Sequence, residues 1–478
     1  MNYGMIKRIL GYVLLIEALC LTLPLICSLV YGEPHALPVW TLCICICLIL
    51  GIVLTLGKPK SKQMFAKEGF VTVALSWIVI SLFGAVPFVI SGFIPSFTDA
   101  LFETVSGFTT TGASILKDVE RLPHSMLFWR SFTHWIGGMG VLVFIVAILP
   151  VSADSFYLVK AESPGPSVSK LVPKVRTTAK ILYGIYILFT LIEIVMLICG
   201  GMKIFDALTL SFGTAGTGGF AIKNSGLADY SSYSQIVITV FMIIFGVDFS
   251  FYYLVLMRKF RSAVKHEEVW GYLAIIAASV IIISINCAPL FSGIGETVKH
   301  AAFQVGSIIT TTGYSTVDFN HWPELSKAVL VMLMFFGACA GSTGGGIKIS
   351  RIMILVKSIV KEVKLLAHPK STIKIKMSGR TVEHETIRAV NVFMAAYLLI
   401  FVVSAIIISM DNFDFTTNFT AVAATLNNIG PGLSKVGPAT NFSLYSTLSK
   451  TVLIFDMLIG RLEIFPILIL FAPTTWKK

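Results

Sequence analysis

Four short polar loops carry the residues of this chain that are best suited to chemistry. Each loop follows a short, moderately apolar segment and precedes a long hydrophobic stretch, and the four are Thr110-Thr111-Gly112, Thr217-Gly218-Gly219, Thr311-Thr312-Gly313 and Asn428-Ile429-Gly430. Glycine permits the dihedral angles that turn successive carbonyls toward one axis, and threonine adds an uncharged hydroxyl acceptor. Because rings of carbonyl oxygens can replace the hydration shell of a potassium ion, the loops predict a filter for selective cation permeation.

The four loops align with one another without gaps. Placing Gly112 on Gly313 aligns residues 109–114 with 310–315 at every position except Ala113. The match to the second loop also aligns the Asp-Ala-Leu triplets that precede both loops, whereas the fourth match rests on Gly430 and the apolar run before it. A single Thr-Thr-Gly would be an ordinary turn, but four such loops in matching hydropathy indicate an internal repeat.

The composition indicates that the elements holding these loops lie in a membrane. Of 478 residues, 55% are hydrophobic and 13% are charged, and the mean hydropathy is +0.85. No soluble core needs that much apolar surface. A helix needs roughly 20 apolar residues to cross ~30 Å of hydrocarbon. We expect ten such crossings, near residues 8–30, 38–57, 70–92, 128–150, 179–200, 233–257, 270–291, 326–356, 387–410 and 447–471.

The sequence therefore predicts an all-α polytopic membrane protein built from four pore repeats and two additional N-terminal helices. Each repeat comprises a transmembrane helix, a half-helix too short to span, the polar loop and a second transmembrane helix. The half-helix presents its partially negative carbonyl end at mid-membrane, where irregular backbone must be buried or line water. The expected boundaries are 1–68 for the additional helices and 69–178, 179–268, 269–386 and 387–478 for the repeats, the third with an interrupted second helix and a basic cytoplasmic segment.

The positive charges predict the orientation of the chain. Lysine and arginine concentrate in every second loop, at residues 58–67, 160–176, 258–265 and 357–388. Cytoplasmic loops hold most of the positive charge of a membrane protein, so we expect both termini in the cytoplasm. The net charge of +12 then reflects topology, and no nucleic-acid partner is predicted. The basic segment 357–388 is expected to contact anionic lipid headgroups.

Two further features interrupt the apolar pattern. The run Gly341–Lys348 falls within the stretch 326–356 and contains three consecutive glycines, each costing roughly 1 kcal/mol in a helix relative to alanine. It departs from a phosphate-binding loop, because Ile347 occupies the lysine position and no core strand precedes it; a packing kink is the other explanation. Arg461 lies deep in the last stretch, where a charge is by default functional.

Five acidic residues have different expected roles. Asp99 and Asp206 stand at the starts of half-helices, where a carboxylate caps the positive helix end. Glu103 lies on the first half-helix and is expected to raise the local cation concentration. Asp248 and Asp456 lie deep in predicted helices and are expected to form salt bridges inside the bundle. Nothing assembles a nucleophile with a base and an orienting group, so the sequence predicts no catalytic residue and no enzyme.

The chain resembles the Trk/Ktr/HKT superfamily of cation transporters in these loops, in the run Ala340-Gly341-Ser342-Thr343-Gly344-Gly345-Gly346-Ile347-Lys348 and in Gly460-Arg461-Leu462-Glu463. Its length and two additional N-terminal helices look most like the membrane subunit of Trk potassium uptake. The resemblance implies filter glycines at Gly112, Gly219, Gly313 and Gly430, with carbonyls from Thr110, Thr111, Thr217, Gly218, Thr311, Thr312, Asn428 and Ile429. It implies a gate formed by Gly341, Ser342, Thr343, Gly344, Gly345, Gly346, Lys348 and Arg461.

The resemblance also implies a function: gated, channel-like potassium uptake across the bacterial cytoplasmic (inner) membrane. Potassium would be bound at the filter residues, with no other cofactor in this chain, and glycine at position 112 favours potassium because serine there is associated with sodium permeation. The implied partners are a second copy in a homodimer and a cytoplasmic, nucleotide-binding, TrkA-like regulatory subunit. One alternative is a sodium-permeable or ion-coupled (Na⁺/K⁺ or H⁺/K⁺) symporter of the same architecture. Another is a membrane-embedded enzyme or a rocking carrier.

Overall fold

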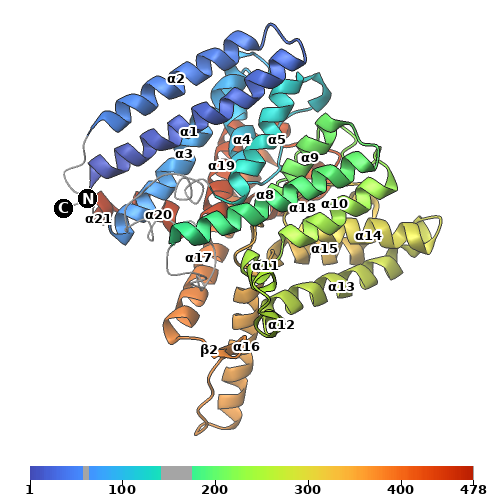
Figure 1. Ribbon diagram of the computed structural model, residues 1–478. Coiled ribbons are helices and arrows are strands. Elements are labelled where there is room, and N and C mark those ends of the chain that lie inside the picture. The colour runs from blue at the N-terminus through green and yellow to red at the C-terminus, as the bar shows by residue number, and fades with distance from the viewer. Residues whose placement is uncertain (58–63, 141–174, 477–478) are drawn as a thin grey trace.

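The computed structural model of this chain describes residues 1–57, 64–140 and 175–476 (Figure 1). Helices dominate the described residues, and the predicted all-α class is confirmed. The described strands β1 (Lys376–Met377) and β2 (Arg380–Thr381) pair antiparallel in a small hairpin beyond α16 (Ile349–Ala367). Figure 1 shows α16 and this hairpin projecting away from the helical bundle.

Four times the chain runs through a long helix, a short helix and a polar loop into a second helix. The long helices are α3 (Ala66–Ile90), α8 (Val175–Cys199), α13 (Glu267–Cys287) and α17 (His384–Ile408). The short helices are α4 (Phe97–Phe108), α9 (Ile204–Gly216), α14 (Ile294–Ile309) and α18 (Phe415–Leu426). Their 12, 13, 16 and 12 residues extend only about 18 to 24 Å, less than the ~30 Å of hydrocarbon.

The second helices are shorter than the sequence predicts. They are α5 (His124–Gly138), α10 (Ser232–Phe245), α15 (Glu324–Phe336) and α19 (Thr447–Arg461). The predicted interruption of the third is confirmed, since α16 resumes only at Ile349. The prediction of unbroken helices over 233–257 and 447–471 is wrong, because α11 (Phe249–Leu256) follows α10 at a 90° bend and α20 (Phe465–Phe471) follows α19 after a break.

Both unexpected breaks have local causes. The side chain of Asp248 accepts a hydrogen bond from the backbone of Ser250 at 2.8 Å and starts α11 in a new direction. Glu463 and Ile464 adopt φ of 55° and 71°, which a continuing α-helix does not allow. Short helices follow at α12 (Phe260–Val264) and α21 (Pro473–Trp476).

By length and composition, six described helices could cross a membrane, and the bent pair α10–α11 would make a seventh. The six include the N-terminal pair α1 (Tyr3–Val30) and α2 (Leu37–Leu56). The other predicted crossings contain the short second helices or, as at 141–150, residues outside the described ranges. The predicted basic positions at 58–63 and 160–174 also lie outside the described residues.

The four units close into a ring. The second helix of each unit packs on the short helix of the next, as α5 on α9, α10 on α14, α15 on α18 and α19 on α4. At the junction of the last and first units, α20 packs on α3 and Lys67 Nζ donates to the carbonyl of Thr474 at 3.0 Å. The hairpin of α1 and α2 lies outside this ring, where α1 contacts α3 and α5.

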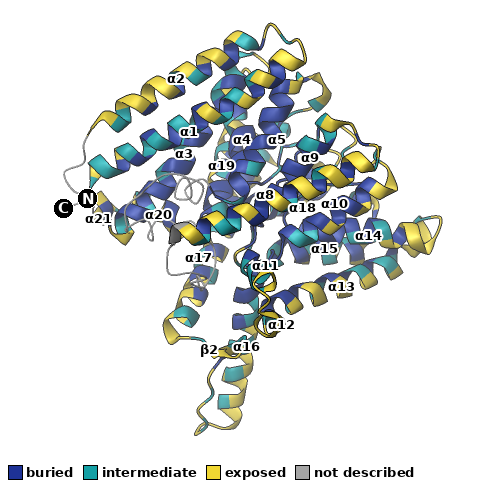
Figure 2. Ribbon diagram, viewed as in Figure 1, coloured by how far each residue is buried: buried dark blue, intermediate teal, exposed yellow. Residues whose placement is uncertain are grey.

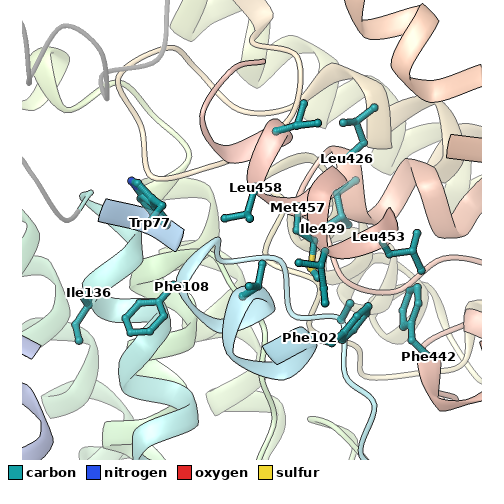
Figure 3. Packing of buried hydrophobic residues seen from close by; sticks show 14 of the residues in the cluster. Trp77, Phe102, Phe108, Ile136, Leu426, Ile429, Phe442, Leu453, Met457 and Leu458 are labelled. Atoms are coloured by element: carbon teal, nitrogen blue, oxygen red, sulfur yellow. The ribbon is translucent and has the colours of Figure 1, made fainter. Parts of the chain in front are cut away.

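Burial separates the outside of the ring from its centre. Figure 2 shows exposed residues along α2, α8 and α13 and mostly buried residues on the central helices. The exposed side chains include large apolar ones such as Val53, Ile285 and Leu399, as expected for helices in contact with lipid. Inside, Phe102 of α4 packs near Phe442 with ring centroids 5.7 Å apart (Figure 3). This apolar packing joins the first and last units behind the polar loops.

Candidate functional site

The four polar loops share one backbone conformation. The residues two positions before the loop glycines Gly112, Gly219, Gly313 and Gly430 have positive φ: 55° at Thr110, 54° at Thr217, 59° at Thr311 and 55° at Asn428. The glycines themselves have φ of 79°, 76°, 82° and 103°, and the residue between has a negative φ in every loop. Left-handed conformations are unfavourable for threonine, so the surrounding structure must enforce them. The fourth loop, the weakest match in sequence, has the same conformation as the others.

The four glycines contact one another's loops in a closed cycle. A Cβ on Gly112 would overlap the carbonyl oxygen of Gly218, one on Gly219 that of Thr312, and one on Gly313 that of Ile429. The cycle closes at Gly430, where a Cβ would lie 2.8 Å from the carbonyl oxygen of Thr111. All four glycines also line one cavity of about 180 Å³. The structure therefore brings together the four sequence-predicted loops, each touching the next.

The short helices end at these loops. The C-terminal ends of α4, α9, α14 and α18 lie three or four residues before the glycines, so four partially negative helix ends surround the same place. At the other end of α4, Ser96 is the N-cap, while Asp99 pairs with Lys450 at 2.7 Å. Asp206 accepts a hydrogen bond from Tyr230 at 3.0 Å. Neither aspartate is the N-cap residue of its helix, but both lie in the first turn.

The run Gly341–Lys348 lies against two of the loops. The amide of Gly345 donates to Thr311 Oγ1 at 2.7 Å, and a Cβ on Gly345 would lie 2.7 Å from the carbonyl oxygen of Asn427. Lys348 is buried and turns back to donate to the carbonyls of Gly344 and Gly345. The glycine-rich run is thus a folded loop that touches the third and fourth units.

Arg461 joins this loop to the first unit. Its Nη1 donates to the carbonyl of Thr343 at 2.8 Å, and its Nη2 donates to the carbonyls of Gly137 and Gly138, the latter at 2.7 Å. The guanidinium charge therefore faces backbone carbonyls at the end of α5 and in the loop. Nearby Glu463 pairs instead with Arg351 of α16, with Nη1 and Oε1 3.0 Å apart.

The two deep aspartates differ from the prediction and from each other. Asp456 accepts a hydrogen bond from Ser404 at 2.7 Å and forms no salt bridge within the described residues, so that prediction is wrong. Asp248 lies 3.3 Å from Nε2 of His266, which makes an ion pair when His266 is protonated. The hydrogen bond between His266 and Asp248 raises the pKa of His266, whereas burial of His266 lowers it. Asp248 also contacts the glycine-rich loop, because a Cβ on Gly341 would lie 2.6 Å from Asp248 Oδ1.

Comparison with known proteins agrees with this geometry. A family model described as a cation transport protein, TrkH, matches residues 36–277 and 275–478. The potassium uptake protein TrkH of Escherichia coli K12 is 36% identical over 487 residues, covering 100% of both chains. The chain belongs to the TrkH family of cation transport proteins. In the same organism TrkG is 31% identical, covering 99% of this chain and 98% of its own.

A solved structure resembles the whole of this TrkH-family chain. The crystal structure of the potassium transporter TrkH from Vibrio parahaemolyticus matches with a TM-score of 0.90 and 33% identity, covering 100% of both chains. The family consists of membrane transport proteins, so the prediction that the chain is not an enzyme is confirmed.

Sequence reasoning misjudged one residue of this TrkH-family site and missed another. Glu103 is buried and does not face the cavity with a free charge, because Arg130 of α5 pairs with it at 2.5 Å. The expectation that Glu103 raises the local cation concentration is therefore wrong. Arg130 was predictable, since an arginine within the apolar stretch 128–150 is costly unless it is paired.

Proposed function

We propose that this chain is the membrane subunit of a Trk potassium uptake system and conducts K⁺ through the centre of its four-unit ring. The potassium-specific names of the full-length relatives support the ion assignment. The observation that carries the proposal is the closed cycle of Gly112, Gly219, Gly313 and Gly430. A cycle of backbone contacts fixes four loops at equal depth around one path, which is what a carbonyl filter requires.

In the proposed filter, K⁺ exchanges hydration water for carbonyl oxygens of the four loops. The contributing residues would be Thr110, Thr111, Gly112, Thr217, Gly218, Gly219, Thr311, Thr312, Gly313, Asn428, Ile429 and Gly430. The paired left-handed positions in each loop support this, because alternation of backbone handedness turns successive carbonyls toward one side. The four helix ends add partial negative charge without a fixed carboxylate, so an ion is attracted and can still leave.

The proposed gate is the loop from Gly341 to Gly346 with Lys348 and Arg461. Hydrogen bonds from Gly345 to Thr311 and from Arg461 to Thr343 hold the loop against the filter units. The positive charge of Arg461 would also oppose cations that pass close to it. Opening would require the loop to exchange these hydrogen bonds for others or for water.

Regulation, assembly and orientation complete the proposal. A cytoplasmic nucleotide-binding, TrkA-like subunit would act on the gate, and two copies of the chain would form a dimer with one pore each. The relatives' names place them in a Trk system, which supports further components. The basic loops support a bacterial inner-membrane location with both termini in the cytoplasm. The projecting helix α16 offers a surface that the regulatory subunit could contact.

The first test is rubidium uptake into liposomes that contain the purified full-length chain, with sodium as competitor. The parent should take up rubidium with little inhibition by sodium, and Gly112→Ser should both lower rubidium uptake and lose this selectivity, because its side chain meets the carbonyl of Gly218. Gly92→Ser is the matched control, since Gly92 also has a positive φ of 76° but no neighbour within 4 Å of an added Cβ. Sodium-selective flux in the parent, or unchanged selectivity in Gly112→Ser, would contradict the proposal.

A further inference from the structure

One ion pair is buried directly behind the proposed filter. The side chains of Glu103 and Arg130 are 0% and 3% exposed. Every other ion pair within the described ranges has at least one side chain that is 21% or more exposed. Replacing a buried pair by apolar residues is often neutral or stabilising, so stability alone is a weak explanation for it. Its hydrogen bonds indicate another purpose.

The pair connects the segments that follow the glycines of the first and second filter loops. Glu103 accepts hydrogen bonds from the amide of Ile115 at 3.0 Å and from the hydroxyl of Ser114 at 3.0 and 3.1 Å. Arg130 Nη1 donates to the carbonyl of Ala221 at 2.8 Å. Its guanidinium lies over the ring of Phe220, 3.7 Å from the centroid. The contacted residues follow Gly112 and Gly219 by one to three positions, so the pair holds both loops through charge-assisted hydrogen bonds.

A second residue of α5 makes a neutral version of the same connection. His134 lies one turn beyond Arg130 and therefore on the same face of the helix. Its Nδ1 lies 2.7 Å from the carbonyl oxygen of Gly107, and its Nε2 accepts a hydrogen bond from the amide of Phe220 at 3.2 Å. This face of α5 thus holds the end of α4 and the second loop in one rigid arrangement.

The other units lack a counterpart of the charged pair. In the gap-free alignment on the filter glycines, the position of Glu103 is occupied by Leu210, Gln304 and Ala421, and that of Arg130 by Val237, Val331 and Leu448. The third and fourth loops use hydroxyls, as Ser307 donates to the carbonyl of Tyr314 at 2.6 Å and Leu433 donates to Thr420 Oγ1 at 2.9 Å. The strongest support is therefore concentrated on the first and second loops.

We propose that Glu103 and Arg130 are positioning residues for ion selectivity, which hold the first two filter loops at the spacing that suits K⁺. This inference rests on the proposed filter function. Without the pair, the two loops can move inward and coordinate the smaller Na⁺, while the third and fourth loops keep their own hydrogen bonds. Conduction then persists with poorer discrimination.

The test compares sodium and rubidium uptake by the full-length chain in liposomes. The double variant Glu103→Gln with Arg130→Gln removes both charges together and avoids leaving one of them buried alone. Its sodium-to-rubidium flux ratio should rise roughly tenfold, as expected for the loss of one charge-assisted hydrogen bond. The single variant Arg130→Lys, which keeps both charges, should raise the ratio by a smaller factor, because it loses only part of the hydrogen bonding.

The control is Glu324→Gln, which removes an ion pair with Lys327 in which the glutamate side chain is 90% exposed. A structural role alone would lower both fluxes together and leave their ratio unchanged. A monodisperse double variant with the parent's flux ratio would overturn the inference. If the parent itself shows no preference for rubidium over sodium, the filter proposal fails instead, so the two failures are distinguishable.

Discussion

The four polar loops and the second helices of the four units differ in how strictly they repeat. All four loops have the same pair of left-handed positions and the same contact with the next loop. The second helices instead end at Gly138, bend by 90° after Phe245, stop for a long loop after Phe336 and break after Arg461. The comparison teaches that a ring of backbone contacts tolerates little variation in conformation. The second helices are not bound by these contacts, so their length and direction can differ from unit to unit.

The largest effect should come from adding a methyl group to the filter glycines. Gly112→Ala, Gly219→Ala and Gly313→Ala place a Cβ into a neighbouring carbonyl oxygen, whereas Gly430→Ala leaves 2.8 Å. Rubidium uptake should fall by roughly 100-fold in the first three variants, equivalent to about 2.7 kcal/mol, and by roughly tenfold in the last. Equal losses in all four would show that the cycle has no looser junction. Membrane expression and gel filtration would confirm that the variants are folded.

A smaller effect, with the opposite sign, is expected beneath the filter. Arg461→Gln removes the charge and some of the hydrogen bonds to Thr343, Gly137 and Gly138. Rubidium uptake should rise roughly threefold to tenfold, because the loop is held less tightly and the cationic barrier is gone. The sodium-to-rubidium ratio should not change. Arg461→Lys, which keeps the charge, should increase uptake less, and a changed ratio in either variant would mean that gate and filter are not separate.

The smallest effect concerns the pH on the side of the membrane that we propose to be cytoplasmic. The folded pKa of His266 is raised by its hydrogen bond to Asp248, so the attraction is fully present below the ordinary value of about 6.5 and is lost as pH rises through the raised value. Asp248 contacts the loop at Gly341, and the charge of Glu268 also raises the pKa of His266. Uptake should therefore increase about twofold between roughly pH 6 and 8 on the cytoplasmic side.

His266→Gln is the matched variant for this measurement. It keeps a hydrogen-bond donor toward Asp248 but cannot titrate, so the pH dependence of rubidium uptake should flatten. The same slope in parent and variant would assign the dependence to another group.

The regular part of the molecule was the part that the sequence predicted well. The polar loops need glycine where φ is positive and a neighbouring carbonyl oxygen leaves no room for a Cβ, and this need leaves a visible pattern at Gly112, Gly219 and Gly313. Even the fourth loop was found, because its glycine and its hydropathy context remained when its threonines did not. Three consecutive glycines likewise indicated the interruption before α16.

The irregular part was predicted poorly, because its causes are contacts between distant residues. The 90° bend within 233–257 starts at Asp248, which caps α11 locally, but the contacts of Asp248 with His266 and Gly341 come from distant parts of the chain and leave no hydropathy signal. Glu103 was expected to act on ions through its charge, because its neutralisation by Arg130, 27 positions away, is a tertiary contact. A hydropathy pattern identifies apolar stretches, but it does not show which polar residues within them contact one another in the folded protein.

The contact between Lys67 and Thr474 has a consequence for the order of the units along the chain. It joins the start of the first unit to the end of the fourth, next to the packing of α20 on α3. The ring therefore has no first or last member in space, and the contacts around the proposed pore do not depend on where the polypeptide is opened. A circular permutant that lacks residues 1–64, links residue 476 to residue 65 and begins at another junction between units should build the same ring.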